Sequence, residues 1–197
     1  FIHNGHFHGQ PISFAMDCLG ISMVNVGVIS DRRVDRFMDV NSSTGLPPFL
    51  CREDTGVRMG FMGGQFMTAS LVAENRTLAV PASIQSIPTT ANFQDVVSFG
   101  LIAGRKTREI VDNTNHILSF ELLCAAQAAD IRGVDKLSRA GKIMYDAVRE
   151  TIPYLDVDKV YVDELEILKG RIESGEFVQK IEQELGELLV VSDVSGS

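Results

Sequence analysis

The sequence predicts an all-α protein built around a long central helical bundle. No segment of useful length alternates apolar and polar residues with the period of two that strands show. Prolines occur early in the chain, but none lies between Pro88 and Pro153. Apolar residues in that interval recur near helical spacing, which indicates a helix several turns long.

The central helix is expected from about Phe93 to Asp130, with Asn92 as its N-cap. An earlier apolar segment opens with Pro11 in the first turn and predicts a helix that is buried on most sides. Ser30 then stands where a cap would begin a separate short helix over residues 30–39.

The rest of the chain is organised by a change in character near Gly133. Before it we expect a loop over 40–58, an apolar helix over 59–79 and a loop over 80–92. After it the pattern is charged and amphipathic, and it predicts surface helices over 135–152, 162–174 and 176–188. We therefore divide the chain into a bundle part (1–132), a helical tail (133–191) and a disordered end (192–197).

Several of the predicted helices are apolar on all sides. The amphipathic helices of a 197-residue chain cannot cover so much apolar surface. We expect burial against other subunits or against a missing segment, most simply in a helical-bundle oligomer. The alternative is an ordinary helical core within one chain.

Composition excludes some classes of function. The net charge of −8 and the lack of a basic cluster argue against a nucleic-acid partner. No uninterrupted apolar run approaches the roughly 20 residues that a membrane span needs, so no membrane partner is expected. The odd number of cysteines (Cys18, Cys51 and Cys124) fits a reducing, cytoplasmic compartment better than a disulfide framework.

Three histidines near the start, His3, His6 and His8, raise the question of a metal site. Three ligands plus water would suit catalytic zinc, but the spacing H-x-x-H-x-H is not a standard pattern. A positioned histidine or simple loop packing is the better interpretation, so no metal is expected. The sequence also lacks a G-x-S-x-G elbow, a G-x-G-x-x-G loop and a P-loop.

A series of ordered motifs carries a family resemblance. They are GHFHGQPISFAMD, DRRVDRFMD, LPPFL, LLCAAQAADIR and the long stretch from GFMGGQF through SIPTTANFQDVVSFG to AGRKT. Together, from residue 1 to about 132, they resemble the C-terminal part of the aromatic amino acid ammonia-lyases. That family comprises histidine, phenylalanine and tyrosine ammonia-lyases and the related aminomutases.

The resemblance implies an all-α fold of the L-aspartase/fumarase-like type and a homotetramer whose active sites draw on several subunits. It also implies the electrophilic methylidene-imidazolone group (MIO), which forms from an Ala-Ser-Gly tripeptide. No Ala-Ser-Gly occurs in these 197 residues. We therefore expect no cofactor-binding residue in this chain, and we expect the N-terminal part of the enzyme as its partner.

The resemblance also assigns residues to the site. Phe7 matches the phenylalanine that packs near the electrophile, and His8 matches the histidine of the same motif, on the substrate side. His6 replaces the asparagine that the family usually has, which puts local hydrogen bonding there in doubt. Met62 matches a residue that lines the pocket for the substrate side chain, with a core-filling role as the alternative.

Two further positions bear on the substrate. Gln94 matches a position that is glutamate in histidine ammonia-lyases and glutamine in many phenylalanine and tyrosine enzymes, so it is assigned with Phe7 to catalysis. An amide suits a neutral ring and avoids a buried charge, which favours tyrosine or phenylalanine over histidine. Thr90, one turn earlier, is assigned to substrate binding.

Several readings of function stay open at this level. The main one is the C-terminal portion of an MIO-dependent enzyme that eliminates ammonia from an aromatic L-amino acid to give the trans-unsaturated acid. Histidine ammonia-lyase proper and an aromatic aminomutase are alternatives with the same parts. A non-catalytic helical assembly fragment and a metal-dependent enzyme built on the three histidines are alternatives from other classes.

Overall fold

The computed structural model of the chain describes residues 1–2 and 7–188. It contains six α-helices: α1 (Gln10–Met38), α2 (Met62–Leu78), α3 (Gly100–Arg132), α4 (Arg139–Arg149), α5 (Val162–Glu173) and α6 (Glu176–Leu185). Two short 3₁₀ turns, η1 (Pro48–Leu50) and η2 (Val134–Lys136), complete the regular structure. The described residues form no strand, so the prediction of an all-α fold is confirmed.

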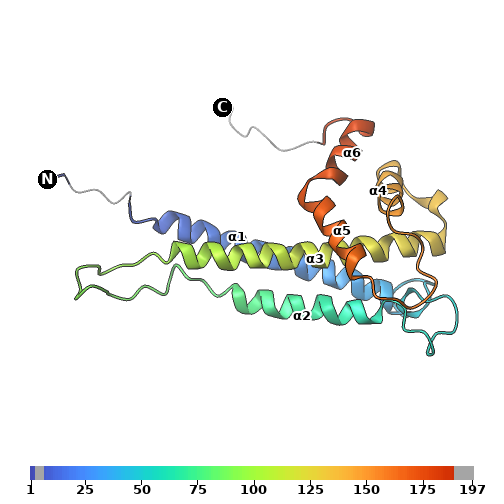
Figure 1. Cartoon of the computed structure of the whole chain (residues 1–197), viewed down its shortest axis with the longest axis horizontal. Coiled ribbons are helices and arrows are strands. Elements are labelled where there is room, and N and C mark those ends of the chain that lie inside the picture. Colours follow the sequence, from blue (N-terminus) through green and yellow to red (C-terminus); the bar gives the residue numbers. More distant parts are fainter. Residues whose placement is uncertain (3–6, 189–197) are drawn as a thin grey trace.

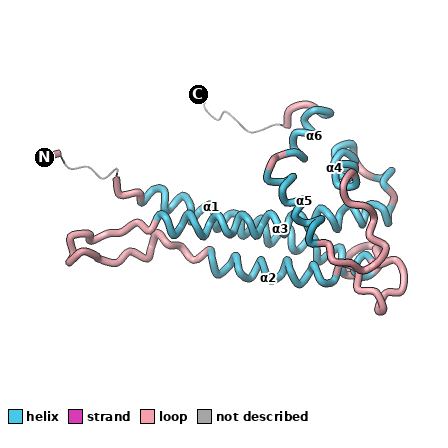
Figure 2. The backbone as a smooth tube through the Cα atoms, viewed as in Figure 1, coloured by secondary structure: helices cyan, strands magenta, loops and turns pink. Residues whose placement is uncertain are grey.

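The three long helices lie side by side and give the molecule an elongated shape (Figure 1). α1 packs along α3 for most of its length, and the shorter α2 contacts both. Helices α4, α5 and α6 gather at one end of this bundle, and the loop over residues 79–99 extends from the other end (Figure 2). The two ends therefore differ in character: one is a folded cap and the other is an extended loop.

Small residues allow the helices to approach closely. A Cβ atom at Gly20 would lie 3.2 Å from side-chain atoms of both Thr107 and Ile110. At Gly64 it would lie 2.1 Å from the ring of Phe120, which is completely buried. Glycine at these positions is thus a packing requirement, because any side chain would push α1 or α2 away from α3.

The main hydrophobic core lies at the end of the bundle that the tail covers. Its centre is an aromatic cluster in which the rings of Phe61, Phe120 and Tyr161 lie 5.7–5.9 Å apart between centroids. Burial raises the pKa of Tyr161 to about 12, so this phenol stays neutral. The tail is therefore joined to the bundle through apolar contacts, and α5 packs directly on α3.

The predicted break at Ser30 is wrong, because α1 continues without interruption to Met38. Ser30 is fully buried, and its hydroxyl donates a 2.6 Å hydrogen bond to the carboxylate of Glu121 on α3. Arg33 pairs with the same carboxylate. A serine that finds a partner on a neighbouring helix does not need to cap its own, which local sequence cannot reveal.

The start of the central helix was also predicted too early. α3 begins at Gly100, and the position before it, Phe99, has a left-handed backbone with φ 49°. Asn92, the predicted N-cap, lies in a turn with φ 68°. Residues 93–99 are not helical: Gln94 pairs with Thr89 in an antiparallel bridge, and the backbones of Val96 and Val97 bond to distant side chains.

The three tail helices form as predicted. Arg171 of α5 is nearly buried and pairs with Glu150 after α4 and Glu176 on α6, which ties the tail helices together. α3 ends at Arg132, and the division of the chain there stays a prediction. The predicted disorder over 192–197 lies outside the described residues.

By length and composition, one described helix could cross a membrane. An 18-residue window of α1 has a mean hydropathy of 1.7, and 22% of that window is buried. Asp17 interrupts the apolar run of this helix, so the sequence contains no uninterrupted run of span length here. One helix that meets these criteria is weak evidence for a membrane span.

Gly64→Ala should destabilise the fold by about 1–3 kcal/mol, because the new methyl group overlaps the ring of Phe120. Gly170→Ala is the matched control, since a Cβ at this helical glycine on α5 meets no atom within 4 Å. The control should be neutral or stabilising by up to about 1 kcal/mol. Urea unfolding measured by circular dichroism compares the two, and equal stabilities would contradict the close α2–α3 contact.

Candidate active site

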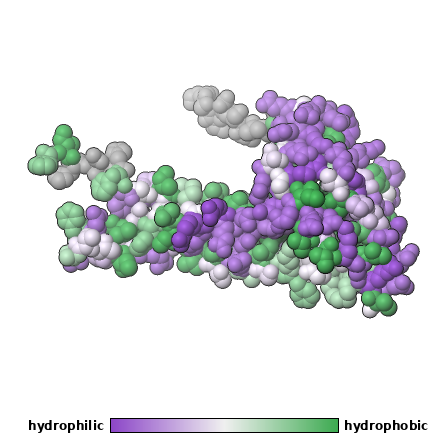
Figure 3. Space-filling view, in the orientation of Figure 1, coloured by the Kyte–Doolittle hydropathy of each residue, from purple (hydrophilic) through white to green (hydrophobic). Residues whose placement is uncertain are grey.

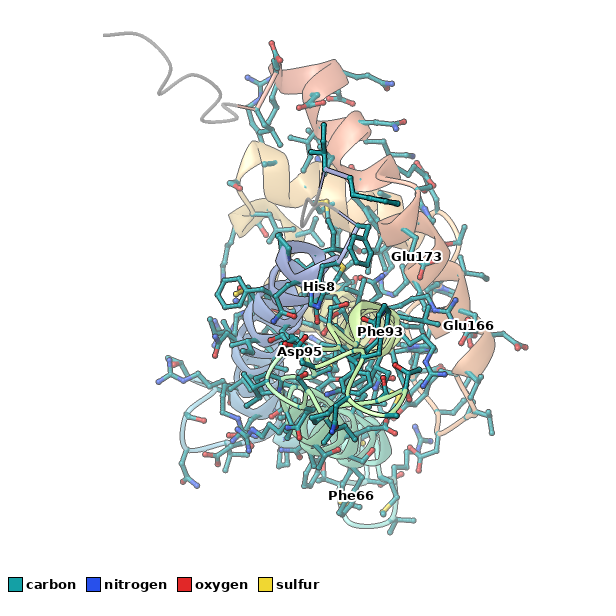
Figure 4. All side chains as sticks on the ribbon, turned by 90° about the vertical axis from the view of Figure 1, so that its left-hand side faces the viewer. His8, Phe66, Phe93, Asp95, Glu166 and Glu173 are labelled. Atoms are coloured by element: carbon teal, nitrogen blue, oxygen red, sulfur yellow. The ribbon has the colours of Figure 1, made fainter. Side chains whose placement is uncertain are left out.

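Four of the five predicted site residues lie at one end of the bundle. Phe7 and His8 precede α1, and Thr90 and Gln94 lie in the 79–99 loop, which runs out beyond the same end of the bundle (Figure 1). Figure 4 looks at this end and shows His8 near Phe93 and Asp95. The chain thus brings together its N-terminal segment and a loop that follows more than 70 residues later.

A direct hydrogen bond joins these two segments. Nε2 of His8 lies 2.8 Å from the backbone oxygen of Val96. A carbonyl oxygen only accepts, so Nε2 carries the proton and donates it. The His8 ring therefore holds the returning side of the loop, which is a positioning contact; its predicted role in substrate binding stays a prediction.

Gln94 lies at the base of the loop tip. Its backbone oxygen accepts a 2.8 Å hydrogen bond from the Thr89 nitrogen, and its own nitrogen donates to the Thr89 oxygen at 3.3 Å. Within the described part of the chain, its side-chain amide has no hydrogen-bond partner. The half-buried amide is therefore fixed through its backbone and free to bind a group from outside the chain.

The tip between the bridged residues is strained. Thr90, Ala91 and Asn92 follow one another with φ values of 50°, 53° and 68°, in the left-handed region that non-glycine residues seldom adopt. Each such residue costs on the order of 1 kcal/mol or more, and a β-branched threonine is the least suited to it. Surrounding contacts must hold this conformation in place.

On the outgoing side of the loop, Lys106 of α3 donates to the Val80 oxygen, and two residues of α1 hold the segment that follows. The carboxylate of Asp17 accepts hydrogen bonds from the backbone nitrogens of Ala82 at 3.2 Å and Ser83 at 2.8 Å. Nε2 of Gln10 donates to the Ser83 oxygen at 3.0 Å. Burial alone would raise the pKa of Asp17, but these amide bonds and the nearby Lys106 lower it below its usual range.

Met62 lies at the far end of the bundle from the other four residues. It begins α2, and the 79–99 loop follows the end of that helix, so about 25 Å of helix separates them by the rise per residue. Phe66, one turn after Met62, is 73% exposed (Figure 4). One copy of the chain therefore does not bring Met62 to Gln94.

A cavity of about 260 Å³ opens beside Phe61, between the 50–61 segment and the 154–161 segment that links α4 to α5. Arg52, Arg58 and Lys159 line it together with acidic side chains, so its charges largely balance. None of the five predicted site residues lines this cavity. It is separate from the loop end.

The metal hypothesis rests on residues that are only partly described. His3 and His6 lie outside the described residues, and the His8 ring is engaged by Val96. Among the described residues, no group of three or more His, Cys, Asp or Glu side chains is arranged to hold a metal ion.

Comparison with known proteins places this architecture. The family model described as aromatic amino acid lyase matches residues 1–150. The chain is 43% identical to a tyrosine ammonia-lyase of Cupriavidus metallidurans over 91% of its own length and 34% of that protein. It is 41% identical to a histidine ammonia-lyase of Natranaerobius thermophilus over 95% of its length and 37% of that protein.

Among solved structures, the phenylalanine aminomutase of Pantoea agglomerans has the same helical fold, with a TM-score of 0.84 and 53% identity. That match covers 87% of this chain and 33% of the aminomutase. The bundle is thus that of the ammonia-lyases and aminomutases. The chain belongs to the aromatic amino acid lyase family, as its motifs predicted, and it spans about a third of the length of these relatives.

Sequence reasoning missed Gln10 and Asp17, which hold the loop. The one available signal was the lone carboxylate of Asp17 in the otherwise apolar segment over residues 11–29. A buried carboxylate needs hydrogen-bond donors, but the sequence does not say which segment supplies them. Here they are two successive backbone amides of the loop.

Asp17 should make a pH-dependent contribution to stability. Its pKa is lowered in the folded state, so its contribution is complete above the ordinary aspartate pKa of about 3.9 and is lost as pH falls through the lower folded value. Asp17→Asn should flatten the loss of unfolding free energy between about pH 5 and pH 2. Urea unfolding of the full-length protein and this variant across that range measures it; parallel curves would contradict it.

Proposed function

We propose that this chain is the C-terminal portion of an MIO-dependent ammonia-lyase that acts on an aromatic L-amino acid and releases the trans-unsaturated acid and ammonia. Tyrosine and phenylalanine are the favoured substrates. The observation that carries the proposal is the loop end, where the loop that carries Gln94 is hydrogen-bonded through Val96 to His8, in the segment that also holds Phe7. Family membership over residues 1–150 supports it.

Gln94 supports the choice of substrate. A neutral amide beside an aromatic ring costs less to bury than a carboxylate would, and it offers both a donor and an acceptor. A carboxylate at this position would favour a basic imidazole or its cation. The exposed ring of Phe93, next to Gln94 in the loop, adds an apolar surface suited to a phenyl or phenol ring.

The MIO group would be supplied by sequence other than these 197 residues, which contain no Ala-Ser-Gly. When present, it provides an electrophile that acts as an electron sink for the amine. The loop end fits a position facing such a group, because its side-chain amide at Gln94 is unpaired in the described chain and Phe7 is 79% exposed. In this chain's part of the site, residues would hold the ring and exclude water.

We further propose that the enzyme is a homotetramer in the cytoplasm. The separation of Met62 from Gln94 supports a site shared between copies. α1 also carries a set of exposed apolar residues that a partner would cover: Ile12, Phe14, Leu19, Ile21, Val26 and Ile29. The face in Figure 3 shows hydrophobic residues grouped over the bundle, whereas hydrophilic residues dominate the tail. The described cysteines are all free thiols, in keeping with a reducing compartment.

An aminomutase is the second candidate, favoured by the 53% identity to the phenylalanine aminomutase of Pantoea agglomerans. It would use the same residues but retain the unsaturated acid and return the amine to the β-carbon. Histidine ammonia-lyase remains an alternative through its named relatives, and Gln94 weighs against it.

The complete protein should convert L-tyrosine or L-phenylalanine into an unsaturated acid that absorbs in the ultraviolet. A β-amino acid detected by mass spectrometry would favour the aminomutase. Product from L-histidine alone would establish the histidine enzyme. If none of the three amino acids gives a product, the hypothesis of a non-catalytic helical assembly fragment is favoured.

The variant Gln94→Glu sharpens this test of the substrate. It should shift the ratio of kcat/KM for histidine over tyrosine upward by roughly tenfold or more, since one favourable charge contact is worth over 1 kcal/mol. Gln85→Glu is the matched control, because Gln85 is an exposed glutamine in the same loop whose side chain hydrogen-bonds only to the Pro81 oxygen among the described residues. A ratio that moves equally in both variants would remove Gln94 from substrate selection.

A site shared between copies should allow two defective chains to complement each other. Gln94→Ala and Met62→Arg each damage one end of the bundle, so a mixed tetramer contains some sites in which both positions are native. Co-expressed full-length variants, purified through different tags, should show activity well above either parent. Activity no higher than the parents would mean that Met62 and Gln94 do not share a site across chains.

A further inference from the structure

The 79–99 loop must hold a strained tip while it lies outside the bundle. Among the described residues, its tip has the Thr89–Gln94 bridge and a 3.1 Å turn hydrogen bond from the Phe93 nitrogen to the Thr90 oxygen, and no backbone pairing joins its two sides further back. A tip with three successive left-handed residues would relax if the two sides of the loop were free to move. The contacts on those sides therefore decide where Gln94 lies.

The outgoing side is held from two directions at one residue. The backbone nitrogen of Ser83 donates to Asp17 at 2.8 Å, and its backbone oxygen accepts from Gln10 at 3.0 Å. Gln10 and Asp17 are seven residues apart on α1, so they project from the same face two turns apart. We call this pair the Ser83 clamp.

Burial of the Asp17 carboxylate would cost free energy if the loop amides did not donate hydrogen bonds to it. The residue is only 8% exposed within an apolar helix, where an unpaired carboxylate would be strongly unfavourable. It accepts no side-chain hydrogen bond from α2 or α3 among the described contacts, and both of its oxygens accept loop amides instead. Its carboxylate thus connects α1 to the loop and not to the bundle core.

The returning side is held at the same end of α1. His8 donates to the Val96 oxygen, and the Val97 nitrogen donates to the Ser86 hydroxyl at 2.8 Å, which ties the two sides of the loop together. With both sides fixed, a shift at Ser83 is passed to the tip.

We propose that Gln10 and Asp17 are positioning residues that set the place of Gln94 in the active site by clamping the backbone of Ser83. The proposal rests on the proposed function for its catalytic consequence. Neither residue contacts the substrate, and both act through the position of the loop.

The test is a double-mutant cycle in the complete enzyme. Asp17→Asn keeps the size of the side chain but removes one acceptor, so it should lower kcat/KM about tenfold when Gln94 is native and much less when Gln94 is alanine. Hydrogen exchange of the peptide covering 80–97 should become faster in Asp17→Asn. Equal losses in both Gln94 backgrounds, or unchanged exchange, would overturn the proposal.

Asp31→Asn is the matched control. Asp31 is a buried aspartate on the same helix that accepts a 2.7 Å hydrogen bond from Thr68 of α2, about 20 Å from Asp17 by helical rise. Its replacement should lower stability, leave exchange of the 80–97 peptide unchanged and cost the same kcat/KM in both Gln94 backgrounds. Loop exchange that speeds up equally in this control would show general destabilisation and would also overturn the proposal.

Gln10→Ala provides a second variant in case Asp17→Asn does not fold. It releases only the Ser83 oxygen, and it should show the same coupling to Gln94 and the same loop exchange with a smaller effect. Hydrogen exchange also distinguishes a failure of the proposed function from a failure of the Ser83 clamp. A wild-type enzyme without activity on any aromatic amino acid would overturn the proposed function, whereas an unchanged loop in both variants would overturn the clamp itself.

Discussion

The close packing of α1 along α3 is the constraint on which the rest of the structure depends. Glycines at 20 and 27 bring the two helices together, and Thr107 closes the gap with a 2.7 Å hydrogen bond to the Met16 oxygen. The buried hydroxyl of Thr107 is tolerated because it finds this backbone partner. This seam fixes the register of the bundle, and that register decides which loop residues meet the start of α1.

The length of α2 in this bundle separates Met62 from the other predicted site residues. A helix adds about 1.5 Å per residue, so the beginning of α2 and the loop after its end cannot meet within one copy. An active site that uses both ends needs a second chain or a further segment. The exposed apolar residues of α1 and α2 point to the same need, because a single copy leaves them uncovered.

The sequence predicted the elements better than their ends. Apolar periodicity identified all the long helices, because burial of one face is repeated many times along each of them. The two misplaced boundaries, at Ser30 and Phe93, each depend on a contact that local sequence does not show. Ser30 has the local sequence of a helix cap, but its hydroxyl bonds to Glu121, which is distant in sequence. Before Gly100, the bridge between Thr89 and Gln94 holds the chain in a loop instead of a helix. Left-handed backbone at Thr90 and Ala91 has no local signal at all.

Some site residues could be identified from sequence motifs, and others only from the folded structure. Phe7, His8, Thr90 and Gln94 were accessible through the family motifs, whereas Gln10 and Asp17 acquire their significance only when the loop folds back on α1. One consequence concerns how the site keeps its geometry. Phe7 and His8 are joined to α1 through the chain, and the loop is joined to the same helix through Ser83. The start of α1 therefore holds both segments of the site, and Lys106 of α3 adds a further contact to the loop at the Val80 oxygen.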